Sequence, residues 1–289
     1  MTRPDVSVVV VHYDTPDLLE RCLDSITTGT DELAVETFVV DNGSPRFDVE
    51  RQRAARPDVT WIANPDNRGF AVASNQALRL AEGRYALLLN PDASLRPDTL
   101  PTMVGYMDAD RTIGCSTARV ELEDGRLDAA CRRAFPTPER SFYRISMLSK
   151  MFPRSRRFGQ YNLTYLDEWQ ETEIDSPCGA FMLVRREVLR GVGLLDERFF
   201  LYGEDLDWAL RIKRAGWRIT YNPAATVDHR KRASSRRHRA PSIRHFHDAM
   251  RLFYSKHYAP TQPWLIDRLM LMAIGLRERV ELAATRLAR

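Results

Sequence analysis

Apolar residues follow two alternating patterns along the first part of the chain. Val6–Val11 is apolar apart from Ser7, and Tyr85–Leu89 is continuously apolar, which is typical of strands buried on both faces of a sheet. Asp17–Thr27 instead carries its apolar residues at helical spacing. The further elements expected are strands at Ala34–Val40 and Val59–Ala63 and helices at Asp48–Ala55, Ala71–Ala81 and Thr99–Asp108. This alternation predicts an α/β fold with a mostly parallel, Rossmann-like sheet flanked by helices.

The second half of the chain has a less regular pattern. Loops and short helices are expected from Val120 to about Ile174. Beyond it we expect a strand at Cys178–Val184, helices at Arg186–Val192, Leu206–Ala215, Ala249–Tyr258 and Trp264–Leu287, and short extended pieces at Ile219–Tyr221 and Thr226–Val227. No repeat or low-complexity linker interrupts the chain. The pattern therefore predicts one main domain, residues 1–258, and a C-terminal helical extension, residues 259–289.

Polar side chains follow two of the expected strands at the point where each strand ends. Asp41–Ser44 follows one and Asn90–Asp92 follows another, and ligands of such sheets bind beyond the carboxyl ends of the strands. The carboxylate of Asp92 suits a hard cation such as Mg²⁺ or Mn²⁺. The alternative is a plain turn in which Asp92 caps the following segment, and the local sequence alone favours that turn.

A cluster of acidic residues opens the helix that runs to Ala215. Glu204, Asp205 and Asp207 stand in its first turn, where the helix dipole already favours negative charge. The functional alternative is a general base in a partly desolvated cleft. The neighbouring aromatic run contains Phe199, Phe200 and Tyr202. Aromatic walls beside carboxylates suit a carbohydrate pocket, although this segment taken alone favours an ordinary acidic helix start.

One histidine and a basic segment follow this helix. His229 is a candidate metal ligand, although a lone histidine is more often a surface residue. The segment Arg230–Arg244 is rich in arginine, and Arg230 and Arg236 are candidates for gripping a pyrophosphate. A solvated basic loop or a nucleic-acid-binding surface are the alternatives. No helix-turn-helix, zinc-ligand or RNA-binding aromatic signature accompanies the run, so we expect no nucleic acid as partner.

Cysteine usage and the termini bear on location. The chain has 4 cysteines, which are scattered and form no close pair, as expected for a reducing cytoplasm. We expect no signal peptide and no membrane span, because no stretch reaches about 18 uncharged apolar residues. The helix at Trp264–Leu287 mixes apolar residues with arginines. It suits peripheral contact with the inner face of the plasma membrane, or packing on the domain or on a second subunit in a homodimer.

Taken in order, these segments resemble a known family. The segments are VVVVHYDTPDLLERCL, VVDNGS, NRGFAVASNQAL, LLLNPDA, CGAFMLVRREVL, GLLDERFFLYGEDLDWALRIKRAGW and a trailing His229. Their order and spacing resemble glycosyltransferase family 2, whose members have the GT-A fold, and most closely its bacterial rhamnosyltransferase-like branch. The resemblance extends from Val6 to about Tyr258 and implies an inverting, metal-dependent sugar transferase.

The resemblance also implies roles for individual residues. The implied donor-binding residues are Tyr13, Asp41, Asn42, Asn75, Asn90, Arg230 and Arg236. Asp92 and His229 would bind the divalent cation, Mg²⁺ or Mn²⁺. Asp205 would be the general base, with Glu204 and Cys178–Gly179 shaping the acceptor side. Asn90 departs from the family pattern, which has an acid there, so His229 and the donor phosphates would supply more of the coordination.

Only the resemblance to the rhamnosyltransferase-like branch indicates the donor and the acceptor. It favours dTDP-L-rhamnose as donor, with a UDP-hexose or UDP-galactofuranose as alternatives, and a cell-envelope glycan or a polyprenyl-diphosphate-linked saccharide as acceptor. Two other functions remain open: a nucleotidyltransferase that forms the sugar nucleotide, and a nucleic-acid-binding protein. The first would need a glycine-rich, arginine-containing loop after the first strand, which His12–Pro16 does not resemble.

Overall fold

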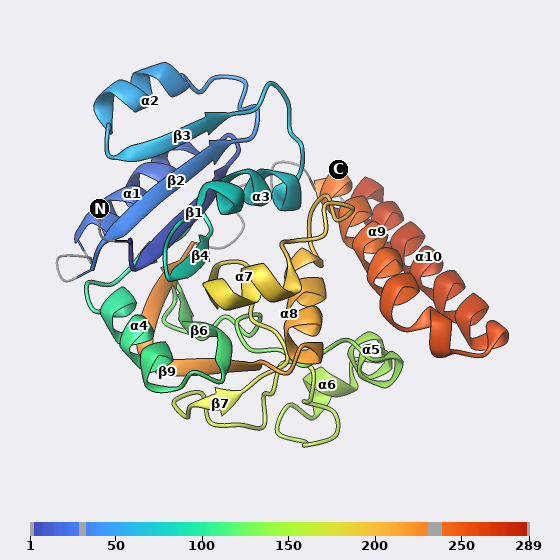
Figure 1. The fold of residues 1–289 in the computed structure, drawn as a ribbon. Helices are drawn as coiled ribbons and strands as arrows, with labels where there is room; N and C mark the ends of the chain where they lie inside the picture. Colours follow the sequence, from blue (N-terminus) through green and yellow to red (C-terminus); the bar gives the residue numbers. More distant parts are fainter. Residues whose placement is uncertain (1–2, 29–32, 231–238, 288–289) are drawn as a thin grey trace.

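The computed structural model describes residues 3–28, 33–230 and 239–287. The strands are β1 (Val6–His12), β2 (Val35–Asp41), β3 (Val59–Ala63), β4 (Tyr85–Leu89), β5 (Ala93–Leu95), β6 (Ile113–Leu122), β7 (Thr172–Glu173), β8 (Phe181–Arg185) and β9 (Arg218–His229). The helices are α1 (Pro16–Thr28), α2 (Val49–Ala55), α3 (Phe70–Leu80), α4 (Thr99–Ala109), α5 (Pro138–Ile145), α6 (Leu148–Met151), α7 (Arg186–Val192), α8 (Glu204–Arg214), α9 (Arg239–His257), a 3-10 turn η1 (Ala259–Thr261) and α10 (Trp264–Leu287). Figure 1 shows the sheet beside a separate pair of C-terminal helices.

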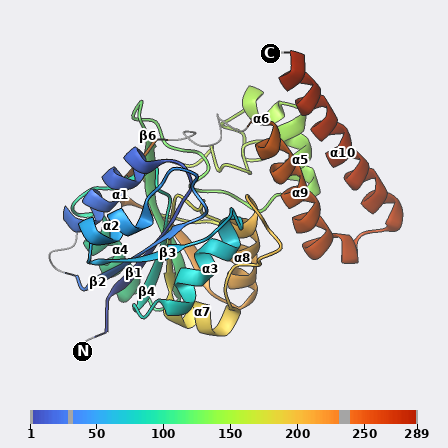
Figure 2. The same ribbon diagram turned by 90° about the horizontal axis from the view of Figure 1, so that it is seen from above.

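One sheet joins all the strands in the order β3-β2-β1-β4-β8-β6-β9-β5, with β7 added against β9. The pairs β1–β2, β1–β4 and β2–β3 are parallel, as the alternating pattern predicts. Beyond β4 the sheet is mixed, because β8 runs antiparallel to both β4 and β6. Helices α1, α2 and α4 cover one face, and α3, α7 and α8 cover the other (Figure 2). The α/β prediction is confirmed, but the sheet is mixed rather than mostly parallel. Besides the first four strands, β6 pairs with β9 in parallel, whereas β5 and β7 run antiparallel to β9.

The ends of three parallel strands lie at one edge of the sheet. His12 of β1 pairs with Asp41 of β2, and Val10 of β1 pairs with Leu89 at the end of β4. The polar residues that follow β2 and β4 therefore meet at that edge, as the sequence predicts. Every residue of β1 is buried, as is every residue of β4, which explains why both strands are mainly apolar.

The sequence does not predict strand β6, because polar residues interrupt its apolar pattern although they are buried. Ser116 and Thr117 are fully buried and donate hydrogen bonds to the carbonyl oxygens of Thr220 and Phe181. Strand β9 was expected as two short pieces but is continuous. The ladder with β6 skips from Asn222 to Thr226, an interruption that includes Pro223, which has no amide hydrogen to donate.

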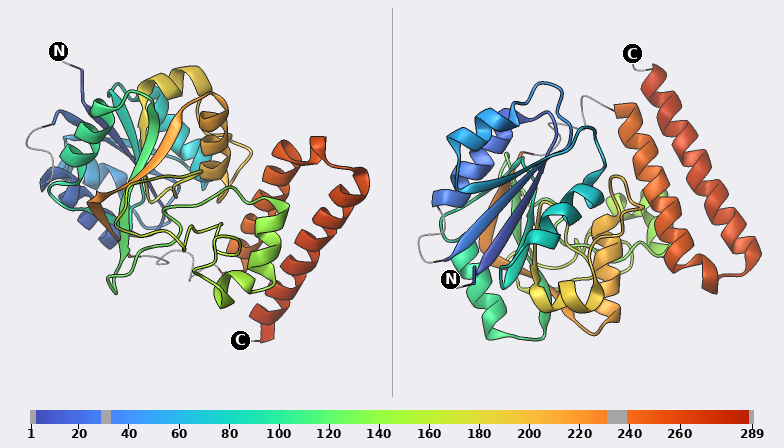
Figure 3. Two further views of the ribbon diagram at one scale, coloured as in Figure 1. Left: turned by 90° about the horizontal axis from the view of Figure 1, so that it is seen from below. Right: turned by 45° about the horizontal axis from the view of Figure 1, so that its top comes forward.

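The C-terminal helices form a hairpin at one side of the sheet (Figures 1 and 3). Helix α9 begins at Arg239 rather than at the predicted Ala249, whereas α10 has the predicted bounds. An ion pair between Arg251 and Glu278 joins the two helices, and α5 lies beside them (Figures 2 and 3). The predicted boundary at residue 258 thus falls inside the hairpin, and the division into two units stays a prediction. None of the described helices combines the length and apolar character needed to cross a bilayer.

Candidate active site

A cavity of about 320 Å³ lies between the sheet edge, the start of α8 and the hairpin. Four residues singled out in the sequence line it: Asn90, Glu204, Asp205 and His229. Cys178 and Gly179, from the segment before β8, also border it. The structure therefore brings together the residues expected at the metal site and those expected at the acceptor site.

Asp92 and His229 meet because of strand pairing. Ala93 of β5 pairs with His229 of β9, and Arg230 donates its backbone amide to the carbonyl oxygen of Asp92 at 2.8 Å. The side chains follow, with His229 Nε2 at 3.1 Å from Asp92 Oδ1. On the other side of the imidazole, Nδ1 lies 3.2 Å from Asp128 Oδ2. A carboxylate on the far nitrogen fixes the ring of a metal-binding histidine in this way.

The two carboxylates also set the charge of His229. Burial disfavours the protonated ring, but the hydrogen bonds and negative charges of Asp128 and Asp92 outweigh burial and raise its pKa to about 9. A divalent cation would take the place of the Nε2 proton between Asp92 and His229. Among the described residues, no group of three or more His, Cys, Asp or Glu side chains is arranged to hold a metal. A cation here would therefore need further ligands from a bound substrate.

Gly203 sets the start of α8. Its φ of +81° is a left-handed conformation that favours glycine, and the helix begins at the next residue. Asp205 then borders the cavity, and its Oδ2 accepts a hydrogen bond from Arg133 Nη2 at 2.6 Å. Burial disfavours the charge on Arg133, but the carboxylate of Asp205 outweighs it and raises the pKa of the guanidinium. Arg133 in turn fixes the position of the Asp205 carboxylate at the cavity wall.

Of the two acids that line the cavity, Glu204 is the less completely hydrogen-bonded. It is 6% exposed, and in the described part of the chain its Oε2 has no hydrogen-bond partner. Burial, together with the negative charge of Asp205, raises the pKa of Glu204 to about 8. A buried carboxyl with a raised pKa beside an ionised neighbour is typical of functional sites.

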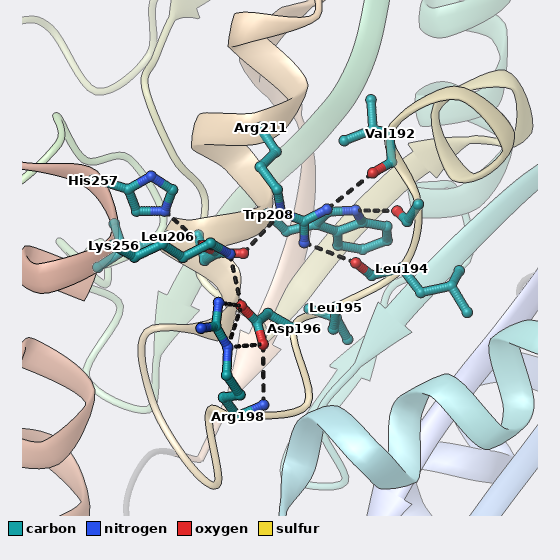
Figure 4. A network of polar contacts seen from close by, with 12 residues as sticks. Val192, Leu194, Leu195, Asp196, Arg198, Leu206, Trp208, Arg211, Lys256 and His257 are labelled. Atoms are coloured by element: carbon teal, nitrogen blue, oxygen red, sulfur yellow. Dashed lines mark hydrogen bonds and ion pairs between the residues drawn. The ribbon is translucent and has the colours of Figure 1, made fainter. Parts of the chain in front are cut away.

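Asp207, in the same turn, lies away from the cavity. It is fully buried and accepts hydrogen bonds from Arg211 Nε at 2.8 Å and Lys256 Nζ at 2.6 Å. His257 Nε2 lies 2.6 Å from its Oδ1. Burial raises the pKa of Asp207, but these partners outweigh it and lower the pKa to about 2. Figure 4 shows Arg211, Lys256 and His257 converging on this side of α8.

The residues expected at the nucleotide lie at the ends of β1 and β2, outside the cavity. Asp41 is buried, with Oδ1 at 2.9 Å from His12 Nδ1 and Oδ2 accepting the amide of Ser44 at 3.2 Å. Tyr13 is half-buried next to His12. A second hollow of about 410 Å³ lies nearby, lined by Asp14, Thr15, Pro16, Asp17, Leu18, Arg46 and Phe47.

Three expected donor residues make structural contacts instead of lining the cavity. Asn42 donates to Asn67 and Gly69 and accepts from Asn64 and Arg68. Asn75 exchanges hydrogen bonds with the backbone of Leu195 and donates to Glu197.

The side chain of the third residue, Arg230, points toward Glu123, with Nε and Oε1 3.4 Å apart. Arg236 lies outside the described residues. The pyrophosphate grip expected from these two arginines therefore stays a prediction.

Sequence reasoning missed two residues that hold the site together. Asp128, on the second ring nitrogen of His229, is 101 residues away in sequence. Arg133, on Asp205, is 72 residues away. Both stand in the irregular segment after β6, where no local pattern separates them from surface residues.

The family model described as Glycosyl transferase family 2 matches residues 7–193. An N-acetylglucosaminyl-diphospho-decaprenol L-rhamnosyltransferase of Mycobacterium tuberculosis is 27% identical over 267 residues, which cover 87% of this chain and 84% of that protein. The rhamnosyltransferase WbbL of Escherichia coli K12 is 30% identical over 167 residues, covering 56% of this chain and 59% of that protein.

A crystal structure of GalNAc-T7 with UDP, GalNAc and Mn²⁺ has a similar fold. The TM-score is 0.62 at 17% sequence identity, and the match covers 88% of this chain and 50% of that chain. The expectation of a GT-A-like α/β fold is confirmed.

Proposed function

This chain belongs to glycosyl transferase family 2, and we propose that it transfers L-rhamnose from dTDP-L-rhamnose to a hydroxyl of a polyprenyl-diphosphate-linked saccharide, with inversion. The observation that carries the proposal is the single cavity that Asp205, Glu204 and His229 share, with Asp92 in contact with His229. The names of two relatives, both rhamnosyltransferases, support the sugar, and the decaprenol in one name supports the lipid-linked acceptor.

Asp92 and His229 are the residues that would hold Mg²⁺ or Mn²⁺. Their carboxylate oxygen and imidazole nitrogen suit such cations, and Asp128 fixes the ring for this purpose. When bound, the cation supplies charge neutralisation at the departing diphosphate. The donor phosphates would complete its coordination, which fits a site with only two protein ligands.

The nucleotide would lie along the same sheet edge. Tyr13 directly follows β1, which pairs with β4, and Asp41 ends β2 on the other side of β1. The hollow beside Phe47 offers room for a base. Asn90 borders the cavity between this edge and α8. Donor binding across the carboxyl ends of β1, β2 and β4 agrees with the general rule for α/β sheets.

Asp205 would act as the general base. It takes the proton from the acceptor hydroxyl, while the hydroxyl oxygen forms a bond to the anomeric carbon. The bond from that carbon to the diphosphate breaks, and its electron pair stays on the nucleotide diphosphate. The single displacement inverts the anomeric carbon. The ion pair with Arg133 would hold the carboxylate in place for the arriving hydroxyl.

Helix α10 would rest on the cytoplasmic face of the plasma membrane. Its exposed apolar residues include Trp264, Leu269, Met272, Leu276 and Val280, at 53–75% exposure. Arg268 and Arg279 are also exposed on this helix and would meet anionic headgroups. A homodimer through the same face is the competing arrangement, and sedimentation of the protein without lipid separates the two.

A panel of nucleotide-sugars tests the donor assignment directly. The protein is heated with each donor, with and without Mn²⁺, and the midpoint of unfolding is measured. We expect dTDP-L-rhamnose to raise the midpoint more than UDP-sugars and only when Mn²⁺ is present, because ligands stabilise the native state by mass action. Equal midpoints with every donor would refute the donor assignment.

A further inference from the structure

The cavity has two chemically different ends. Glu204, Asp205 and His229 form the polar end described above. The hairpin supplies another wall, which includes Phe246, Met250, Phe253, Tyr258, Met270 and Ile274. None of these hairpin residues carries a charge. The hairpin therefore gives the cavity an uncharged, mainly apolar wall in addition to its polar residues.

A sugar alone does not account for that wall. Sugar hydroxyls placed against apolar side chains lose their hydrogen bonds to water without replacing them. A hydrocarbon chain, by contrast, is stabilised by every methylene group that it buries. The wall formed by Phe246, Met250 and Met270 matches such a chain.

Helix α10 presents apolar side chains in two directions. Met270 and Ile274, one turn apart, line the cavity, and Ile274 is 5% exposed. Leu269, Met272 and Leu276 lie on other faces of the same helix and are more than half exposed. A lipid held at the cavity side of α10 would thus stay next to a surface suited to a bilayer.

The size of the cavity limits what enters. Its volume of about 320 Å³ is at the small end for ligand pockets. It has room for the carbon atoms next to the diphosphate, and the remainder of a long chain would stay in the membrane.

We propose that the α9–α10 hairpin forms a subsite for the first isoprene units of a polyprenyl-diphosphate-linked acceptor. The polar end of the cavity receives the acceptor sugar, and the hairpin wall receives the chain. This subsite rests on the proposed function, because it assigns the lipid part of the same acceptor.

Binding of geranyl diphosphate tests the subsite without any transfer reaction. Its dissociation constant, measured by calorimetry, is compared with that of inorganic diphosphate, which lacks the chain. We expect geranyl diphosphate to bind at least about tenfold more tightly, as burial of several carbon atoms predicts. The half-buried Met270 is then changed in the Met270→Gln variant, which should remove most of this advantage.

Met151→Gln is the matched control, since Met151 is 67% exposed and lies outside the cavity wall. It should leave both dissociation constants unchanged. Equal binding of geranyl diphosphate and inorganic diphosphate would overturn the subsite, as would an equal loss for both ligands in Met270→Gln.

A transfer assay separates this subsite from the proposed function. The acceptors are N-acetylglucosamine diphosphates that carry a geranyl or a methyl group. Met270→Gln should raise KM for the geranyl acceptor about tenfold more than for the methyl acceptor. Chain-dependent binding without transfer to either acceptor would uphold the subsite and contradict the proposed function. Transfer with equal KM values for both acceptors in the unmodified protein would uphold the proposed function and contradict the subsite.

Discussion

The two sides of helix α8 hold carboxylates from the same turn in opposite states. On the rear side, Asp207 is fully buried and contacts Arg211, Lys256 and His257. On the cavity side, Asp205 has one cationic partner, Arg133, and Glu204 has an oxygen without a partner in the described structure. The rear side attaches α8 to α9, while the cavity side faces the space where substrates would bind.

Two residues of one helical turn thus have different roles: Asp207 anchors the helix, and Asp205 is available for chemistry. A carboxylate whose pKa lies at about 2, as for Asp207, is a poor proton acceptor at neutral pH. Asp205 borders the cavity and can be reached by a hydroxyl. The rear contacts hold the helix in place so that the cavity side keeps its geometry.

The largest effect is expected from Asp205→Asn. Loss of the general base should lower kcat about 100- to 10,000-fold, because a neutral amide cannot accept the proton. Transfer of labelled sugar measures this effect. Asp248→Asn is the matched control at an exposed position and should retain kcat. Unchanged kcat in Asp205→Asn would mean that the cavity side of α8 carries no base.

Asp207→Asn should act on stability instead. Removing the charge leaves the buried His257 and the half-buried Arg211 and Lys256 without their carboxylate, which costs about 3–5 kcal/mol of unfolding free energy. Urea denaturation measures the loss.

The wild-type contribution of Asp207 also has a defined pH dependence. Its pKa is lowered from 3.8 to about 2, so its stabilisation is present above pH 3.8 and is lost as the pH falls through 2. Asp248→Asn, at an exposed ion pair, should change the unfolding free energy by less than about 0.5 kcal/mol. A similarly small loss in Asp207→Asn would remove the distinction between the two sides.

Glu204→Gln tests the cavity side through the pH dependence of the unfolding free energy. The pKa of Glu204 is raised from 4.5 to about 8, so the native protein keeps a proton that the unfolded chain has released between these values. The wild type therefore loses stability as the pH rises through this window, by up to about 1.4 kcal/mol per pH unit. The glutamine variant lacks this dependence. Parallel stability curves for the two proteins from pH 5 to 8 would contradict the buried, protonated state.

The smallest effect is expected at the exposed face of α10. This helix belongs to the same hairpin as α9, which contacts Asp207. Leu276 is 65% exposed, and Leu276→Glu should change the unfolding free energy by less than about 0.5 kcal/mol. Its binding to anionic vesicles should fall about tenfold, because an apolar contact is lost and a like charge is added. Leu276→Lys should bind more tightly than Leu276→Glu. Vesicle sedimentation measures both, and equal binding of all three proteins would exclude this face.

The sequence predicts the strands and helices that have one regular pattern. Strands β3 and β4 and helices α7 and α10 have the predicted bounds, since their apolar residues follow a single period. Strand β6 could not be predicted in this way, because buried Ser116 and Thr117 break its apolar pattern and are satisfied only by β9 and β8.

The state of each acid in α8 could not be predicted from the local sequence. Asp205 and Asp207 differ through Arg133 and Lys256, which are 72 and 49 residues away. Asp128 likewise reaches His229 across 101 residues. The sequence named Asp205, Asp92 and His229 as candidates through the family resemblance, whereas their partners follow only from the folded chain.

The anomeric configuration of the product tests the central claim most directly. The protein is incubated with Mn²⁺, dTDP-L-rhamnose and a polyprenyl-diphosphate-linked N-acetylglucosamine, and the product is analysed by NMR. A single displacement assisted by Asp205 predicts a new glycosidic bond whose anomeric configuration is opposite to that of the donor. A product that keeps the donor configuration would contradict this account.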